Sequence, residues 1–434
     1  MARLFGTDGI RGLANGDVLT PELALAVARS AARVLGGRTV AIGRDTRPSG
    51  AMLESAAAAG FTSAGMDVLL LGVVPTPAVA HVVAAGEADL GLVLSASHNP
   101  MPDNGLKLFA RGGSKLADEQ EDAVEAGLAD RHGVTGAAVG RVDVAGPEPV
   151  EAWLDSLQAS AGSLAGLTVV VDGADGAASH LAPELYRRAG ATVFELHCDG
   201  DGARINDGSG ATHPQPLAAE VLRRGADLGI AHDGDADRCI VVDAAGRVVN
   251  GDQVLGLLAL ARREAGLPGS DVLVATVMSN LGLHQAMSAA GVDVLQTAVG
   301  DRYVLAAMLA GDHRLGGEQS GHVVLRDHAT TGDGLLTAMQ VMDRMVRSGR
   351  SLADLAAAVV LLPQVLVNIR ADRSRAVAPE VLAAVQQQEA ELAGAGRVLL
   401  RPSGTEALVR VMVEAPDEQQ AQLVADRLAA VVAG

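Results

Sequence analysis

Short apolar runs alternate with longer amphipathic stretches along most of the chain. The apolar runs are rich in Val, Leu and Ile and have the length of buried strands, whereas the stretches between them place apolar residues at helical spacing. Parallel strands need long crossover connections, which are usually helices. The alternation therefore predicts βαβ units with mostly parallel sheets.

The first amphipathic stretch carries sequence signals for both the start and the end of a helix. Thr20 is a suitable N-cap, Pro21 fits the first helical turn, and Gly36-Gly37 stops the helix. One face of this stretch carries the apolar residues Leu23, Val27, Ala31 and Val34. We expect a helix between these two signals.

The predicted strands come in three successive sets, and the order of elements repeats from one set to the next. The sets are "TVAIGRD", "DVLLLG" and "GLVLSAS", then "LTVVVDGADG", "TVFELH" and "LGIAHDGD", then "VLVATVMSN", "VDVLQTAVG" and "HRLGGEQS". From about Gln364 the order changes to strand, helix, strand, strand, helix. We expect three similar α/β domains with mostly parallel mixed sheets over residues 1–150, 151–251 and 252–363, and a smaller C-terminal α+β domain over residues 364–434.

Composition narrows the class of protein. Hydrophobic residues make up 49% and charged residues 20% of the chain, which is typical of globular proteins. A formal net charge of −18 argues against nucleic acid as the partner, because phosphate neutralisation needs a basic face. A small anionic substrate remains compatible, since the local placement of Arg and Lys sets the field of a cleft.

No feature indicates secretion or a membrane. The N-terminal segment lacks the apolar core of a signal peptide, so we expect a cytoplasmic protein. Residues 68–86 are long enough to cross a bilayer, but Pro75, Pro77 and His81 favour strand, turn and helix. Cys198 and Cys239 lie in apolar surroundings, and we expect buried thiols rather than a disulfide framework.

Unusual polar clusters follow several of the predicted strands. Open α/β sheets place their ligand sites beyond the carboxyl ends of strands. "GLVLSASHNP" is one such cluster, in which an apolar run ends in two serines, a histidine and Asn-Pro. An ordinary turn would also explain this stretch, because Ser and Asn-Pro form turns by themselves.

"HDGDADR" places three carboxylates, Asp233, Asp235 and Asp237, directly after a strand. Two carboxylates about 4 Å apart repel by roughly 4 kcal/mol at an effective dielectric of about 20, so three converging carboxylates need a cation. The alternative is a solvated acidic loop. An EF-hand calcium loop is excluded, because Arg238 and Ala244 occupy its Gly and Glu positions. A site with a small number of hard oxygen ligands favours Mg²⁺.

Three further clusters suit a sugar phosphate. "RPSGTEALVR" places Arg401 and Arg410 around a Ser-Gly-Thr turn, where guanidinium groups, hydroxyls and main-chain N–H groups can hold a phosphate. "GGEQSGH" offers Glu318 and Ser320 to sugar hydroxyls. Either stretch could instead be a plain turn. The Gly-rich loops around Arg11, Arg44 and Arg47, together with Lys107, could hold anions or carry ordinary surface charge.

Ser97 could be a hydrolase nucleophile, but the G-x-S-x-G elbow is absent around it. His98 is its neighbour in sequence, and neighbouring strand residues point to opposite faces, so we expect His98 to be poorly placed as the direct base of a triad. A serine beside a carboxylate-bound metal and phosphate-binding arginines indicates a phosphoryl carrier.

The four ordered motifs "SASHNP", "DGDADR", "GGEQSGH" and "RPSGTE" resemble those of the α-D-phosphohexomutases, and the resemblance covers essentially the whole chain. "FGTDGIRG", Ser95 and Gln319 are similar to the bacterial branch that acts on amino-sugar phosphates. The resemblance implies four domains around a central cleft. It also implies that Ser97 is phosphorylated for activity.

The resemblance implies roles for individual residues. One Mg²⁺ per subunit would be bound by Asp233, Asp235, Asp237 and a phosphoryl oxygen on Ser97, with Arg238 beside that phosphate. Glu318 and Ser320 would contact sugar hydroxyls. The nonreacting phosphate would be held by Arg401, Ser403, Gly404, Thr405 and Arg410, and the residues implied near the reacting centre are Lys107, Arg11 and His322.

The reaction implied by the resemblance interconverts glucosamine 6-phosphate and glucosamine 1-phosphate through a 1,6-bisphosphate, in UDP-N-acetylglucosamine and cell-wall precursor synthesis. The bisphosphate must turn around in the cleft, which a mobile C-terminal domain would permit. Two alternatives stay open: a mutase that prefers glucose or mannose phosphates, and a noncatalytic regulator that binds metal and sugar phosphate. The sequence does not determine the oligomeric state, so a homodimer also stays open.

Overall fold

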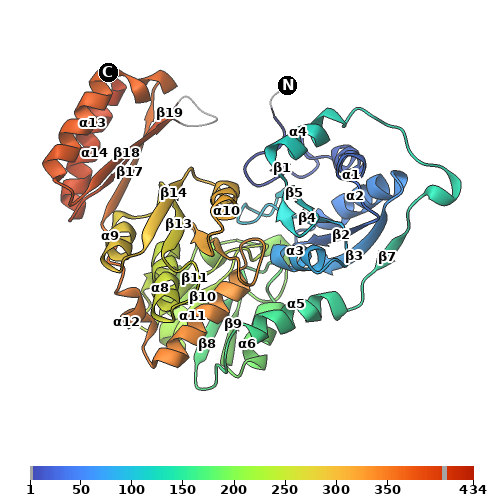
Figure 1. Ribbon diagram of the computed structural model, residues 1–434, viewed down its shortest axis with the longest axis horizontal. Helices are drawn as coiled ribbons and strands as arrows, with labels where there is room; N and C mark the ends of the chain where they lie inside the picture. Colours follow the sequence, from blue (N-terminus) through green and yellow to red (C-terminus); the bar gives the residue numbers. More distant parts are fainter. Residues whose placement is uncertain (1–2, 403–407) are drawn as a thin grey trace. The chain divides into compact units, whose positions relative to one another are not determined.

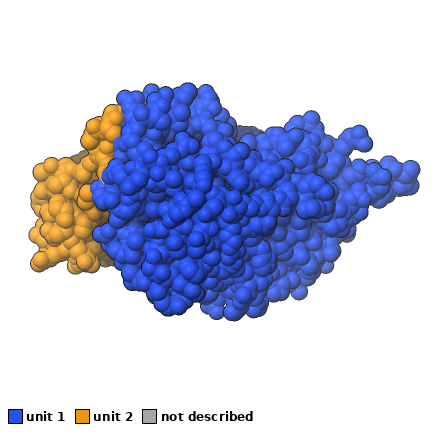
Figure 2. Space-filling view, turned by 90° about the horizontal axis from the view of Figure 1, so that it is seen from below, with its two compact units in different colours: residues 1–277, 292–357 blue, residues 278–291, 358–434 orange. Residues whose placement is uncertain are grey.

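The computed structural model describes residues 3–402 and 408–434, and this part of the chain forms four β-sheets (Figure 1). By their internal contacts the residues divide into two compact units. One unit comprises Met1–Val277 and Val292–Ala357, and the other comprises Met278–Gly291 and Ala358–Gly434 (Figure 2). The four domain boundaries expected from the sequence stay a prediction.

The first sheet has the strand order β1-β5-β4-β2-β3-β7, and β6 pairs with β5. The helix expected after Thr20 is α1, and the Thr20 side chain accepts a hydrogen bond from the Leu23 main chain as an N-cap. The strands are β1 (Ile10–Leu13), β2 (Thr39–Arg44), β3 (Asp67–Val73), β4 (Leu90–Leu94), β5 (Asp103–Ala110), β6 (Ser114–Lys115) and β7 (Val142–Val144). The helices are α1 (Pro21–Leu35), α2 (Gly50–Ser63), α3 (Thr76–Ala84) and α4 (Asp118–Ala126), with a 3₁₀ turn, η1, at Gly136–Ala138.

The second and third sheets are smaller, with the orders β12-β11-β10-β8-β9 and β14-β13-β15-β16. The second contains β8 (Thr168–Asp172), β9 (Thr192–Leu196), β10 (Leu228–Ala231), β11 (Ile240–Asp243) and β12 (Val248–Val249), with α5 (Glu148–Ala159), α6 (Leu181–Arg188), α7 (Gln215–Arg224) and the 3₁₀ turns η2 (Gly202–Arg204) and η3 (Gly210–Thr212). The third contains β13 (Val272–Thr276), β14 (Asp293–Thr297), β15 (Leu315–Gly317) and β16 (Val323–Leu325), with α8 (Gly251–Glu264), α10 (Asp301–Ala310), α11 (Gly334–Ser348) and α12 (Leu352–Ala356). Helix α9 (Leu281–Ala289) comes between β13 and β14 in sequence but belongs to the other compact unit.

The C-terminal sheet is wholly antiparallel, with the order β17-β19-β18. Its elements are β17 (Gln364–Arg370), η4 (Arg373–Val377), α13 (Pro379–Leu392), β18 (Arg397–Pro402), β19 (Leu408–Glu414) and α14 (Glu418–Ala433). Buried aliphatic side chains of the sheet, such as Val409 and Val411, share a core with Val424 and Leu428 of α14. This order of elements confirms the α+β pattern expected after Gln364.

The first three sheets share one local arrangement. Each contains a strand that pairs in parallel with one neighbour and antiparallel with the other: β4 lies between β2 and β5, β10 between β8 and β11, and β15 between β13 and β16. The serine, aspartate and Glu318 motifs leave the carboxyl ends of these three strands. The expected repeat of three α/β blocks is therefore confirmed at the level of topology.

Other expectations from the sequence are also met. Residues 68–86 form most of β3, a turn and α3. Among the described residues, no helix is both long and apolar enough to cross a membrane. Cys198 and Cys239 are buried free thiols, and burial raises the pKa of Cys198 to about 12.

Candidate functional site

Ser97 lies in the loop after β4 and is fully buried. Its hydroxyl donates a hydrogen bond to Oδ2 of Asp233 over 2.5 Å, so the serine motif and the aspartate motif meet directly. Ser97 adopts a left-handed backbone conformation with φ 52°, which is unusual for a residue with a side chain. Through this turn, Nδ1 of His98 comes within 3.2 Å of the Ser97 hydroxyl. The expectation that His98 is poorly placed beside Ser97 rested on extended backbone, and the left-handed Ser97 instead brings the two side chains together.

The three aspartates lie in the loop after β10, and all are buried. One carboxylate oxygen from each lies within 4.8 Å of the others. Burial, Asp237 and Asp235 together raise the pKa of Asp233 to about 7. Within the described part of the chain, Oδ1 of Asp235 and Oδ1 of Asp237 have no hydrogen-bond partner despite their burial. Converging buried carboxylates with unused oxygens fit a metal cation.

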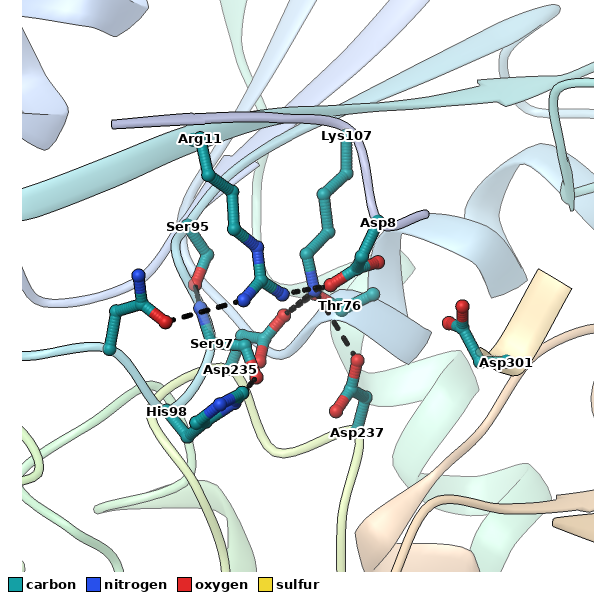
Figure 3. A network of polar contacts seen from close by, with 12 residues as sticks. Asp8, Arg11, Thr76, Ser95, Ser97, His98, Lys107, Asp235, Asp237 and Asp301 are labelled. Atoms are coloured by element: carbon teal, nitrogen blue, oxygen red, sulfur yellow. Dashed lines mark hydrogen bonds and ion pairs between the residues drawn. The ribbon is translucent and has the colours of Figure 1, made fainter. Parts of the chain in front are cut away.

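Lys107 reaches this cluster from β5, and only 2% of its side chain is exposed (Figure 3). Its Nζ lies 2.7 Å from Oδ2 of Asp235, 3.3 Å from Oδ2 of Asp237 and 2.9 Å from Oδ2 of Asp8. Burial lowers the pKa of this ammonium group, but Asp235, Asp8 and Asp237 outweigh burial and hold the pKa well above its usual value. Lys107 is therefore a charged donor beside the aspartates.

A chain of charges that the sequence analysis did not identify extends from Lys107. Asp8 forms ion pairs with Lys107, Arg11 and Lys115. Lys115 also pairs with Asp301, at the start of α10. Asp301 follows β14 after a short loop, so its position near a strand end was the available signal.

Arg238 and His322 lie opposite one another in an isolated antiparallel bridge. Nε of Arg238 lies 3.9 Å from carboxylate oxygens of both Asp233 and Asp237. His322 is buried between carboxylates, with Nδ1 3.6 Å from Asp237 and Nε2 3.7 Å from Asp301. Burial lowers the pKa of His322, but these two carboxylates outweigh it and raise the pKa above its usual value.

Glu318 follows β15, and its Oε1 accepts a hydrogen bond from the main-chain N–H of Gly300 over 2.9 Å. The Ser320 hydroxyl is buried and has no partner among the described residues. A pocket of about 210 Å³ brings together most of the residues named so far. Its lining includes Asp8, Arg11, His98, Asp237, Arg238, Asp301, Glu318 and His322. The structure thus gathers polar groups from four separate sequence motifs around one space large enough for part of a small ligand.

Arg401 and Arg410 are directly opposite one another on β18 and β19. Like charges at opposite positions of an antiparallel pair repel, so this placement favours an anion between them. Ser403, Gly404 and Thr405, also expected at the phosphate site, lie outside the described residues.

Arg44 and Arg47, which the sequence offered as anion-binding residues, have other partners. Arg44 lies 3.5 Å from Glu54. Arg47 is fully buried beside Asp45 and bonds main-chain oxygens of the loop that carries Ser97. Neither guanidinium belongs to the pocket that contains Arg11.

Family models of phosphoglucomutase/phosphomannomutase match most of the chain. The α/β/α domains I, II and III match residues 2–132, 150–246 and 250–361, and the C-terminal domain matches residues 366–431.

Full-length relatives agree with these matches. The chain is 61% identical over 444 residues to the phosphoglucosamine mutase of Saccharopolyspora erythraea, covering 100% of this chain and 99% of that protein. It is 57% identical over 445 residues to the phosphoglucosamine mutase of Rhodococcus jostii, covering 100% of each. Among solved structures, a phosphoglucomutase/phosphomannomutase family protein from Burkholderia thailandensis superposes with a TM-score of 0.83 at 25% identity, covering 99% of this chain and 97% of that one.

Proposed function

Because this chain belongs to the phosphoglucomutase/phosphomannomutase family, we propose that it is a phosphoglucosamine mutase that interconverts glucosamine 6-phosphate and glucosamine 1-phosphate. The observation that carries the chemistry is the 2.5 Å hydrogen bond between the Ser97 hydroxyl and Asp233. A buried serine held against a cluster of metal-binding type is suited to carry a phosphoryl group. The choice of sugar rests on the two relatives, which share more than half of their residues with this chain.

Mg²⁺ is the metal we propose for the aspartate cluster. Asp233, Asp235 and Asp237 would hold it together with a phosphoryl oxygen on Ser97, and the unused oxygens of Asp235 and Asp237 support this assignment. When bound, the ion supplies positive charge to the oxygens of the transferring phosphoryl group.

The surrounding residues of this chain would position the sugar and stabilise charge. In the proposed reaction, a free sugar hydroxyl attacks the phosphorus of phosphorylated Ser97, the bond from phosphorus to Oγ breaks, and the proton of the attacking hydroxyl ends on Oγ of the restored serine. Lys107, Arg11 and Arg238 would donate hydrogen bonds to the phosphoryl oxygens, and their ion pairs with carboxylates of the site support this role. We propose that His322 stays protonated between Asp237 and Asp301 and also donates toward this group.

Glu318, which lines the pocket, and Ser320 would hold the sugar hydroxyls, and the Ser320 hydroxyl without a partner among the described residues supports this role. Arg401 and Arg410 would hold the phosphate that does not react, together with Ser403, Gly404 and Thr405. The 1,6-bisphosphate then returns its other phosphoryl group to Ser97 after turning around. The reaction belongs to the synthesis of UDP-N-acetylglucosamine and cell-wall precursors.

The test compares kcat/KM for glucosamine 6-phosphate with the values for glucose and mannose phosphates, with Mg²⁺ and a trace of sugar bisphosphate present. We expect a ratio of about 10-fold or more in favour of the amino sugar. Protein groups that form hydrogen bonds with the 2-amino group would lose their partner when another substituent replaces it, and unpaired buried polar groups are unfavourable. A ratio near or below one would assign the enzyme to glucose or mannose phosphates. Binding without any turnover would indicate a regulator.

A further inference from the structure

Arg47 is a fully buried cation, and most of the hydrogen bonds that its side chain donates go to main-chain oxygens. Its Nη1 donates to the carbonyls of Pro100 and Asp103, over 2.5 and 2.9 Å, and its Nη2 donates to those of Ser97 and Asn99, over 3.0 and 2.7 Å. Its Nε donates to the carboxylate of Asp45 over 2.9 Å. The guanidinium therefore makes hydrogen bonds to four carbonyls of the seven-residue segment 97–103 and is closed to solvent and substrate.

Asn206 bonds two of the same carbonyls from a different part of the chain. Its Nδ2 donates to the main-chain oxygen of Ser97 over 2.9 Å and to that of Asn99 over 3.0 Å. Asn206 lies in the loop between β9 and β10, more than 100 residues from Ser97 in sequence. The carbonyl of Ser97 is thus bonded from both the first and the second sheet regions.

Asp45 connects this arrangement to the other side of Ser97. The Ser95 hydroxyl donates to Asp45 over 2.6 Å. The main-chain N–H of Ser97 donates to the same Ser95 hydroxyl over 2.8 Å (Figure 3). Both the N–H and the carbonyl of Ser97 are therefore held by one connected set of side chains. Left-handed backbone is unfavourable for a non-glycine residue, so such a conformation persists only where its surroundings enforce it.

We infer that Arg47 and Asn206 are positioning residues that hold the backbone of Ser97 so that its hydroxyl stays aimed at the metal cluster and the sugar. The inference rests on the proposed role of Ser97 as phosphoryl carrier. Phosphoryl transfer depends mainly on positioning, and a misplacement of about 1 Å can reduce the rate about 100-fold. Lysine cannot replace Arg47, because its three donors lack the planar fork that spans carbonyls on two sides.

Two variants test the inference. Asn206→Asp keeps the shape of the side chain and removes both donors, and Arg47→Lys keeps the charge and removes the fork. We expect each to lower kcat by about 10- to 100-fold on folded protein, with KM for glucosamine 6-phosphate within about 2-fold of the parent value. We also expect hydrolysis of phosphorylated Ser97 to fall less than transfer to sugar, because a displaced phosphoryl group still meets water.

Arg44→Lys is the matched control, since Arg44 ends β2 just before Arg47 in sequence and pairs with Glu54 instead of the serine loop. It should keep the parent kcat and the parent ratio of hydrolysis to transfer. The double variant should lose less than the product of the single losses, because the two side chains share the carbonyls of Ser97 and Asn99.

Parent values of kcat and of the hydrolysis ratio in folded Asn206→Asp would overturn the inference, as would a loss of kcat that only follows the folded fraction measured by circular dichroism. If Arg47→Lys does not fold, the kcat and the hydrolysis ratio of Asn206→Asp alone test the inference. Ser97→Ala separates the two levels of the argument. Turnover by Ser97→Ala would refute the phosphoryl-carrier proposal itself, whereas an inactive Ser97→Ala with a fully active Asn206→Asp would refute only the positioning role.

Discussion

The Ser97 hydroxyl donates its hydrogen bond to Asp233, a residue 136 positions later in the chain. This contact joins the loop after β4 to the loop after β10, and both side chains are fully buried. A hydroxyl that carried a phosphoryl group would place the new oxygens beside three carboxylates. The charge of such a phosphoserine can be tolerated there only with a cation and the neighbouring basic side chains.

Replacing Ser97 by alanine should abolish mutase turnover and leave sugar-phosphate binding measurable, because the variant removes the proposed acceptor atom and little else. Intact-protein mass spectrometry should show an added phosphoryl group on the parent after incubation with sugar bisphosphate and none on the variant. A variant that still turns over substrate would rule out Ser97 as the carrier.

Removal of divalent metal by a chelator should lower activity by about 100-fold or more, since a catalytic metal supplies several kcal/mol of charge stabilisation. Added Mg²⁺ should restore activity and raise the Tm of the parent. In Asp235→Asn the rise in Tm on adding Mg²⁺ should be smaller. An equal rise in parent and variant would place the ion elsewhere.

Arg410→Ala should lower kcat/KM for glucosamine 6-phosphate by about 10- to 100-fold, because a hydrogen bond to a charged group contributes about 1.5–3 kcal/mol. Stability should be unchanged or slightly higher, since the change relieves repulsion with Arg401 directly opposite. Arg427→Ala is the control, because Arg427 lies on α14 of the same domain and pairs with Glu391. Equal losses in both variants would argue against a phosphate site at Arg410.

Asp333 should give the protein a measurable pH dependence of stability. It is the N-cap of α11, and burial raises its pKa to about 6 although Leu336 N–H and the Trp153 indole N–H donate to it. The folded-state pKa lies above the unfolded value of about 3.9, so the stabilising effect of its protonation is fully present below about pH 4 and is lost as the pH rises through about 6.

The loss from Asp333 amounts to as much as about 3 kcal/mol between these pH values. Asp333→Asn cannot titrate and keeps one oxygen for the N-cap hydrogen bond from Leu336, but its amide nitrogen cannot accept the hydrogen bond from Trp153. Denaturant midpoints measured from pH 4 to 7 should therefore fall for the parent relative to this variant. Parallel curves for the two proteins would show that Asp333 does not titrate in this range.

The sequence alone determined which elements form and which motifs follow them. Apolar runs of strand length and capped amphipathic stretches are local properties, and the predicted strands, α1 and the order of elements after Gln364 match the structure. The motifs around Ser97, Asp233 and Glu318 were found because polar residues after a buried strand are informative by themselves.

The tertiary structure decided where individual side chains point and with what they pair. Arg47 reads as a surface cation in "GRDTRPSG" but lies at 1% exposure under the serine loop, and His98 turns toward Ser97 because of one left-handed residue. Lys115 joins Asp8 and Asp301 through contacts that each span more than 100 residues of sequence. The direction and pairing of a side chain depend on backbone register and on partners from distant segments. The local sequence pattern specifies neither the register nor those partners.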